Sequence, residues 1–60
     1  MNFASIGKNI RKYRKQAGMT QDELAEKLFV TRQTVSNYET GKSSPDIDML
    51  VKIAEVLKVD

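Results

Sequence analysis

Apolar residues recur at spacings of three and four positions along most of this chain, and such a period predicts amphipathic helices. Four helical segments can be drawn. The first covers roughly residues 3–16, and Gly18 follows where a helix C-cap favours a residue that tolerates positive φ. The apolar side of this segment comprises Phe3, Ile6, Ile10, Tyr13 and Ala17.

The second segment opens with a strong start signal at Thr20. The sequence TQDE is a capping box, in which the side chains of Thr20 and Glu23 each bind a backbone N–H of the other residue. Met19 and Leu24 occupy the N′ and N4 positions of a hydrophobic staple. The inner side of this segment is predicted to consist of Leu24, Ala25 and Leu28.

The third segment repeats this device and ends near Thr40. Thr31 is its candidate N-cap, with Val30 and Val35 in staple positions, and Gly41 can cap its C-terminus. The turn GKSSPD follows, and a fourth helix is predicted to start near Asp46. Its inward side is predicted to consist of Ile47, Leu50, Ile53, Ala54 and Leu57.

The second and third segments are short and lie about three residues apart, which is the arrangement of a helix-turn-helix unit. On a wheel of roughly 100° per residue, Val35 and Tyr38 fall on one side of the third segment. The other side carries no acid and presents Arg32, Gln33, Ser36 and Asn37. Arg can bind guanine O6 and N7, and Gln or Asn can bind adenine N6 and N7, so this face suits a DNA major groove. The alternative is a polar surface helix without a binding role, and the helix-turn-helix spacing argues against it.

With 60 residues the chain forms one small domain at most, and it contains neither Cys nor His. Disulfide bonds and zinc sites of Cys or His are therefore excluded, and the fold must depend on helix packing. The commonest general base and the most reactive nucleophile are missing, so we expect no catalysis, metal or cofactor. Asp46 and Asp48 fit a helix start better than a metal site. No apolar run approaches the roughly 20 residues of a membrane span.

The net charge is only +2, but the charges are unevenly distributed. Residues 20–60 hold five basic and eight acidic residues. This asymmetry favours an anionic partner near the first segment, and a solvated face whose cations suit the helix dipole explains it equally well. Residues 1–19 hold no acid and five basic residues, namely Lys8, Arg11, Lys12, Arg14 and Lys15.

Residues 6–59 resemble the phage repressor and Cro family of helix-turn-helix domains, also called the xenobiotic-response-element type. The resemblance rests on the combination of IRKYRKQAGMTQDELAEKL, VTRQTVSNYETGKSSP and LVKIAEVLKV. It implies an all-α, compact four-to-five-helix bundle like the lambda repressor domain. It also implies sequence-specific binding of double-stranded DNA by a cytoplasmic, bacterial or phage-encoded transcriptional regulator, more often a repressor than an activator. Members usually act as homodimers on two half-sites, and residues beyond 60 could contribute to dimerisation.

The same resemblance assigns roles to single residues. An anion near the C-terminal end of a helix is disfavoured by the dipole, and a bidentate ion pair with Arg14 would explain Glu39 there. Two independent surface charges are the alternative. Phosphate contacts would come from Gln21, Thr34 and Lys42. Base contacts would come from Thr31, Arg32, Gln33, Ser36 and Asn37.

Phe29 departs from the family pattern, which usually has Gly or Asn there because the backbone is left-handed. A positive φ at Phe29 costs on the order of 1 kcal/mol or more, which packing against the domain or a second copy could offset. Lys58, after Leu57, raises the same question. Asp60 is a plausible N-cap, and we expect a fifth helix to begin there in a longer protein. A charged tail is the alternative.

A protein-interaction module built on the same bundle is the main alternative function. A partner-binding face should be rich in exposed aromatic and aliphatic anchors. The outward face of the third segment has none, which favours DNA over a protein as the partner.

Overall fold

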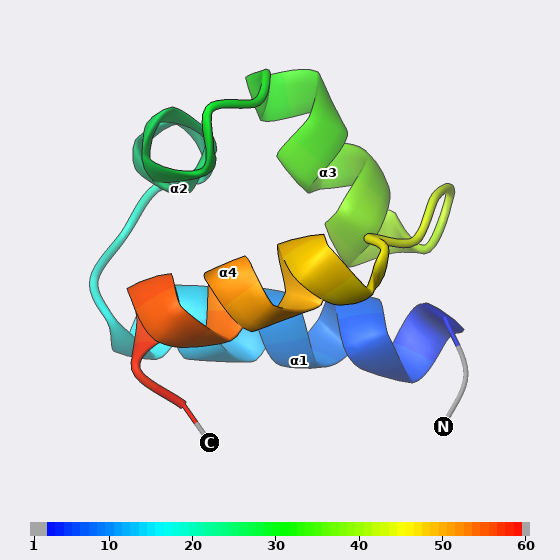
Figure 1. The fold of residues 1–60 in the computed structure, drawn as a ribbon, viewed down its shortest axis with the longest axis horizontal. Helices are drawn as coiled ribbons and strands as arrows, with labels where there is room; N and C mark the ends of the chain where they lie inside the picture. Colours follow the sequence, from blue (N-terminus) through cyan, green and yellow to red (C-terminus); the bar gives the residue numbers. More distant parts are fainter. Residues whose placement is uncertain (1–2, 60) are drawn as a thin grey trace.

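The computed structural model describes residues 3–59, and it describes side chains from Ser5 onward. These residues form the helices α1 (Phe3–Gln16), α2 (Gln21–Leu28), α3 (Arg32–Thr40) and α4 (Ile47–Leu57) (Figure 1). The described part of the chain is therefore all-α, as the sequence predicted. The predicted inward side chain of Phe3 and the predicted helix start at Asp60 lie outside what is described.

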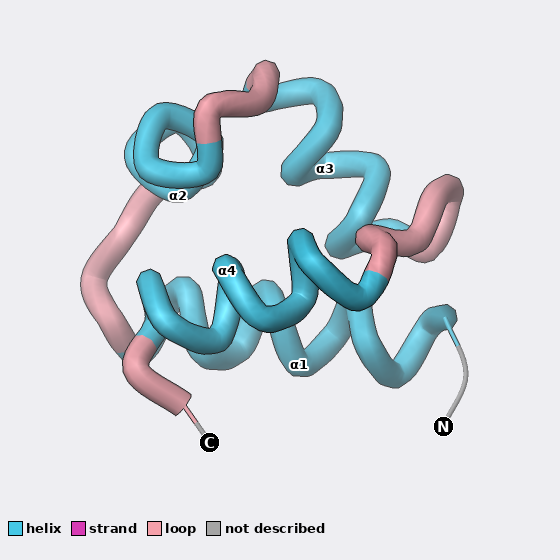
Figure 2. Tube along the Cα trace, in the orientation of Figure 1, coloured by secondary structure: helices cyan, strands magenta, loops and turns pink. Residues whose placement is uncertain are grey.

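The helices pack as two pairs joined by short loops (Figure 2). In Figure 1, α4 lies in front of α1, while α2 and α3 form the helix-turn-helix unit above them. Both α1 and α4 contact this unit, α1 chiefly through α3 and α4 through α2. The unit therefore rests on a base of two helices.

Local hydrogen bonds set the helix ends, and the predicted caps are confirmed. The Thr20 hydroxyl accepts from the Glu23 backbone N–H at 3.1 Å, and the Glu23 carboxylate accepts from the Thr20 N–H at 2.9 Å. Thr31 and Asp46 cap α3 and α4 in the same way, accepting from backbone N–H groups at 3.1 and 2.8 Å. Gly18 has the positive φ that ends α1, at 72°.

The core forms where the helix-turn-helix unit meets its base. Leu24 and Val35 have no exposed surface, and Leu28 has 1%. Ala25 is buried as well, and its small side chain lets α2 and α3 approach each other closely. Half-buried side chains complete the core from the edges, among them Ile6, Tyr13, Met19, Val30 and Tyr38.

Gly7 is the point of closest approach between α1 and α3. A Cβ added to Gly7 would lie 2.4 Å from the carbonyl oxygen of Tyr38 and 2.7 Å from that of Glu39. Real Cβ atoms do not come so near to backbone atoms, so only glycine allows this separation. The position of α3 against α1 therefore depends on Gly7 having no side chain.

The inward side of α4 was predicted incorrectly at its start. Ile47 is 79% exposed, and Leu50 is only half-buried. Met49 and Val56 pack against the core instead. Ile53 and Leu57, also predicted to face inward, are buried. The first turn of α4 has apolar residues on two sides, so the period of three and four residues did not decide between Ile47 and Met49. Ala17 was also predicted to face the core, but it follows the end of α1 and is exposed.

Phe29 has the left-handed backbone that the family resemblance implied, with φ 58° and ψ 40°. Its ring does not enter the core and is 86% exposed. The Lys52 ammonium from α4 lies 4.7 Å from the ring centroid and donates to the Leu28 carbonyl at 3.3 Å. Lys52 therefore binds the C-terminal end of α2 while its charge contacts the aromatic ring. Lys58 has a similar backbone, with φ 57°.

Candidate nucleic-acid interface

The outward side of α3 carries most of the candidate base-contacting residues. Its inner side is anchored by Val35, which has no exposed surface. Because the helix cannot rotate without exposing this residue, the outward side chains hold a defined direction. Thr31, Arg32 and Gln33 are exposed, and Ser36 and Asn37 are half-buried.

Two hydrogen bonds join side chains along this surface. The Gln33 carboxamide donates to the Asn37 carboxamide oxygen at 3.0 Å, across one turn of α3. The hydroxyls of Thr31 and Thr34 lie 2.9 Å apart, and the Thr31 hydroxyl also accepts from the Thr34 backbone N–H. The Thr31 hydroxyl is thus used in capping α3, while the side chains of Gln33 and Asn37 form a hydrogen-bonded pair at the surface.

A buried ion pair fixes α3 to α1. The Arg14 Nε lies 2.6 Å from the Glu39 Oε2, and the Nη2 donates to the Oε1 at 3.2 Å. The two residues are only 7% and 8% exposed. These are the residues that the resemblance pairs, and the contact is bidentate. Arg14 also donates to the Met19 carbonyl at 2.7 Å, so it holds the loop before α2 as well.

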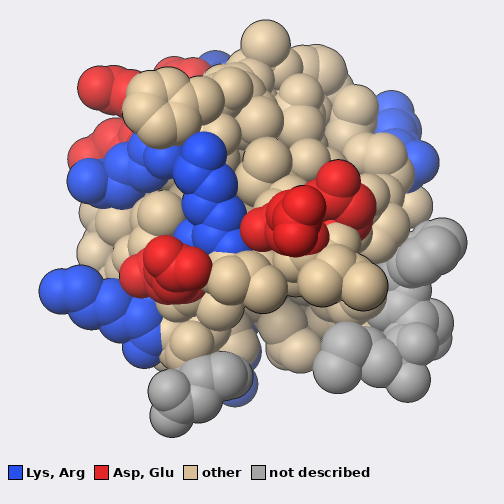
Figure 3. Space-filling model, viewed as in Figure 1, with Lys and Arg blue, Asp and Glu red and all other residues tan. Residues whose placement is uncertain are grey.

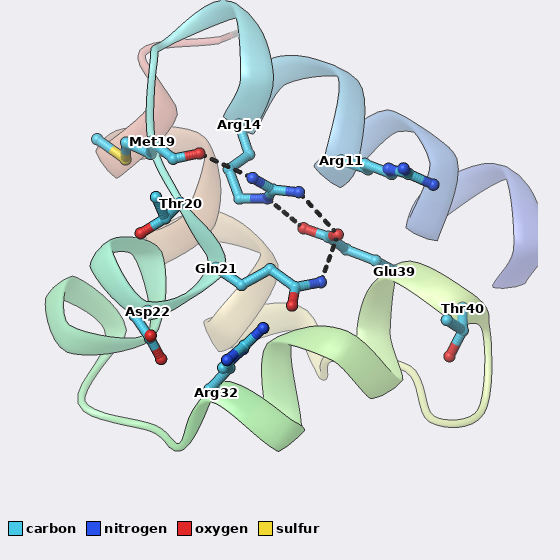
Figure 4. Close-up of a pocket in the computed structure, with 9 residues that line it drawn as sticks. All are labelled: Arg11, Arg14, Met19, Thr20, Gln21, Asp22, Arg32, Glu39 and Thr40. Atoms are coloured by element: carbon cyan, nitrogen blue, oxygen red, sulfur yellow. Dashed lines mark hydrogen bonds and ion pairs between the residues drawn. The ribbon is translucent and has the colours of Figure 1, made fainter.

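Gln21 extends this network to the first residue of α2. Its Nε2 donates to the Glu39 Oε1 at 3.0 Å. In Figure 4 its carboxamide oxygen lies on the side of Arg32, the first residue of α3. One carboxylate therefore sets the relative positions of α1, α2 and α3 at the point where the candidate site opens.

A cleft of about 640 Å³ opens above this network, between α1, α2 and α3 (Figure 4). Arg11 and Arg32 line it from α1 and α3, and Asp22 supplies one acid from α2. Sequence reasoning did not single out Arg11 as a site residue. Its one indication in the sequence was the basic, acid-free run of residues 1–19, and that run does not indicate which of its cations lies beside α3.

The N-terminal end of α2 at this cleft is ordered by its capping box. The backbone hydrogen bond from Thr20, followed by its side-chain hydrogen bond, lowers the pKa of Glu23 below its ordinary value. Glu23 is therefore ionised at neutral pH and completes the cap. The cap keeps the Gln21 backbone, one residue further on, in a helical position.

The remaining candidate residues lie at the edge of α3. Thr34 is half-buried, and Lys42 is exposed in the turn that follows the helix. The backbone N–H of Ser43 donates to the Asn37 carbonyl at 3.3 Å, which folds this turn back onto α3. Within residues 3–59 there is no group of three acidic, His or Cys residues that could hold a metal ion. In the same range, no helix is long and apolar enough to cross a membrane.

Comparison with known proteins gives consistent matches. The family described as "Helix-turn-helix" (HTH_3) matches residues 10–60. The HTH-type transcriptional regulator ImmR of Bacillus subtilis is 42% identical over 55 residues, which is 92% of this chain and 43% of that protein. SinR of the same organism, an HTH-type transcriptional regulator, is 40% identical over 55 residues, 90% of this chain and 50% of that protein. The chain therefore spans about half or less of these relatives.

Solved structures share the arrangement of helices. The clp gene regulator ClgR of C. glutamicum superposes with a TM-score of 0.90 at 26% identity, over 95% of this chain and 73% of that chain. SinR in complex with DNA superposes with a TM-score of 0.83 at 39% identity, over 92% of this chain and 89% of that chain. The fold predicted from the sequence is thus found in the regulators ClgR and SinR, the latter in complex with DNA.

Proposed function

This chain belongs to the helix-turn-helix family HTH_3, the Cro/C1-type DNA-binding domains of transcriptional regulators, and we propose that it binds double-stranded DNA sequence-specifically. The family is not enzymatic. The whole protein would regulate transcription, most simply as a repressor that occupies an operator and excludes polymerase.

One observation carries this proposal: the outward side of α3 presents donors and acceptors without an acid, while the inner side is locked in the core. A major groove about 12 Å wide admits such a helix. We assign base contacts to the outward side chains. They are Thr31, Arg32, Gln33, Ser36 and Asn37, of which the first three are exposed. SinR, which shares the fold, is found in complex with DNA, and this supports DNA as the partner.

Phosphate contacts would set the register of α3 in the groove. We assign them to Gln21 at the start of α2 and to Thr34 and Lys42 at the edge of α3. Arg11 joins them, because it lines the cleft opposite Arg32 and would add positive charge close to the backbone. The Gln21 carboxamide is already held by Glu39, so it would reach a phosphate with little loss of side-chain freedom.

We further propose that two copies bind two half-sites about one helical turn apart. The exposed side of α4, with Ile47 at 79% and Val51 at 53% exposure, would form the contact between them. In Figure 3 acidic side chains gather over the N-terminal end of α4, a further acidic one lies near its C-terminal end, and basic side chains lie between these and past the C-terminal end. An antiparallel, two-fold pairing would bring Asp46 and Asp48 near Lys58 of the second copy.

Analytical ultracentrifugation of the protein with a half-site duplex and with a palindromic duplex measures how many copies bind each DNA. Val51→Lys should abolish cooperative binding to the palindrome and leave half-site affinity unchanged. If Val51→Lys binds the palindrome as tightly as the original protein does, the α4 contact is wrong.

The test of DNA binding is selection from a randomised duplex pool, followed by binding measurements at two salt concentrations. A short consensus with steep salt dependence is expected. Arg32→Ala should cost roughly 1–3 kcal/mol at the selected site and relax preference at one base pair. An equal loss on all sequences would reassign Arg32 to the backbone.

Lys42→Ala provides the contrast, because a phosphate contact carries no sequence information. It should weaken binding on all sequences and reduce the salt slope by about one. Lys27→Ala, an exposed cation on α2 to which no DNA contact is assigned, is the matched control for removing one surface cation. If no sequence is enriched by the original protein and binding at low salt ignores sequence, specific DNA recognition by this chain is refuted.

A further inference from the structure

Gln33 and Asn37 are joined by a hydrogen bond on the proposed DNA-reading surface. We propose that the two carboxamides read one A·T base pair together, as a single unit, instead of reading two base pairs separately. This inference rests on the proposed function and names the base pair that part of α3 would select.

The argument begins with the distance along the helix. Residues four apart in an α-helix are separated by a rise of about 6 Å, at 1.5 Å per residue. Successive bases on one strand are about 3.4 Å apart, so two independent side chains at this spacing would be expected to meet different bases. The hydrogen bond of 3.0 Å removes that separation, because it draws the two carboxamides to one place on the surface.

The second step is the count of groups that the pair leaves available. A carboxamide has one oxygen acceptor and two N–H donors. Gln33 uses a donor and Asn37 uses its oxygen in the bond between them. Gln33 keeps its oxygen and one N–H, and Asn37 keeps both of its N–H groups. The pair therefore offers the Gln33 oxygen as an acceptor beside N–H donors from both side chains.

That combination matches adenine in the major groove. Adenine presents the N7 acceptor and the N6 amino donor, whereas guanine presents the two acceptors N7 and O6. A guanine would take only N–H donors from the pair and would leave the Gln33 oxygen in the groove without a donor, whereas an adenine uses both kinds of group. In the proposed unit the Asn37 amino group donates to N7 and the Gln33 oxygen accepts from the N6 amino group.

Neighbouring residues support a joint role. Asn37 is half-buried and its carbonyl accepts from Ser43, so its backbone is held by the turn after α3. Gln33 is exposed and reaches back over the turn of the helix to the Asn37 oxygen. Arg32 lines the cleft with Arg11 and is not part of this hydrogen bond, so it would read a different position.

The experiment is a double-mutant cycle on the selected operator, with Gln33→Ala, Asn37→Ala and the double variant. Each single variant should lose roughly ten- to a hundredfold in affinity and relax the same adenine column of the consensus. The double variant should be weaker than the worse single variant by no more than about twofold, since either change destroys the unit. The control cycle pairs Arg32→Ala with Asn37→Ala, and its fold-losses should multiply.

Atom substitution at the selected adenine gives a second, independent readout. The original protein should lose affinity on 7-deazaadenine, which lacks N7, and on purine, which lacks the N6 amino group. Gln33→Ala and Asn37→Ala should each become insensitive to both losses, because the carboxamide that remains is no longer held in position.

Three results are decisive against the unit. The unit is wrong if the two single variants relax two different columns of the consensus. It is also wrong if their fold-losses multiply, or if the selected column is not adenine. Each of these results would leave sequence-specific binding intact. Failure of the original protein to select any consensus would instead refute the proposed function, and the inference with it.

Discussion

The buried contact between Arg14 and Glu39 makes a sharp prediction about stability. Glu39 accepts three hydrogen bonds, two from Arg14 and one from Gln21. Both charged residues are less than a tenth exposed. Replacing Glu39 by Gln removes the charge while keeping the shape, and it leaves the Arg14 guanidinium buried with the Met19 carbonyl as its other acceptor.

The magnitude follows from burial. Removing one partner of a buried pair costs roughly 3–5 kcal/mol, because the other charge stays buried without compensation. A near-isosteric change belongs at the lower end, at roughly 3 kcal/mol. A domain of this length has a total stability of about 3–9 kcal/mol, at about 0.05–0.15 kcal/mol per residue. Glu39→Gln should therefore remove a large share of the folding free energy.

Urea denaturation followed by far-UV circular dichroism measures this loss. Glu26→Gln is the matched control, since Glu26 is an exposed acid on α2 and should change the free energy of unfolding by less than about 0.5 kcal/mol. Arg14→Met combined with Glu39→Leu should be more stable than Glu39→Leu alone, because apolar residues can replace a buried pair. If Glu39→Gln costs less than about 1 kcal/mol, the pair behaves as an exposed one and the reasoning is refuted.

Three further predictions concern the positions that hold the helix-turn-helix unit. Gly7→Ala should destabilise by on the order of 1–3 kcal/mol, because its Cβ would press on the α3 backbone. Exposed Asn9→Ala in the same denaturation assay is the control, and equal effects would contradict the close contact. Phe29→Gly should change stability by less than about 1 kcal/mol, because relieving the left-handed strain opposes losing the ring contact with Lys52. A loss above about 2 kcal/mol, a core-like cost, would show that the ring is packed. The lowered pKa of Glu23 means that its ionised form stabilises the fold above its unfolded pKa and that this is lost as pH falls through the folded pKa. Melting temperatures measured across acidic pH should fall less steeply for Glu23→Gln, and parallel curves would argue against the cap.

Local features of this fold were predictable because they depend on residues close together in sequence. The caps at Thr20, Thr31 and Asp46 each join groups three residues apart, so the type of residue and its spacing suffice to identify them. The helix boundaries follow from those caps. The same reasoning located the outward side of α3, since Val35 and Tyr38 define one apolar side and leave the polar side unambiguous.

The partners of Arg14 required more than local pattern. Arg14 and Glu39 are 25 residues apart, and the resemblance to a family, rather than composition or spacing, paired them. Neither source indicated that Gln21 would bind the same carboxylate. Nor did the basic run indicate that Arg11 would lie across a cleft from Arg32. Such contacts depend on how helices are placed in space, which short-range patterns do not contain.

The sequence by itself thus determined where helices begin and end, that the chain is all-α, and which side of α3 is polar. Tertiary structure alone decided which apolar residue at the start of α4 is covered. Ile47 and Met49 are both apolar, and the choice of Met49 over Ile47 was made by packing against the other helices. The hydrogen bond between Gln33 and Asn37 was likewise decided by the structure, because a spacing of four residues permits that bond without requiring it.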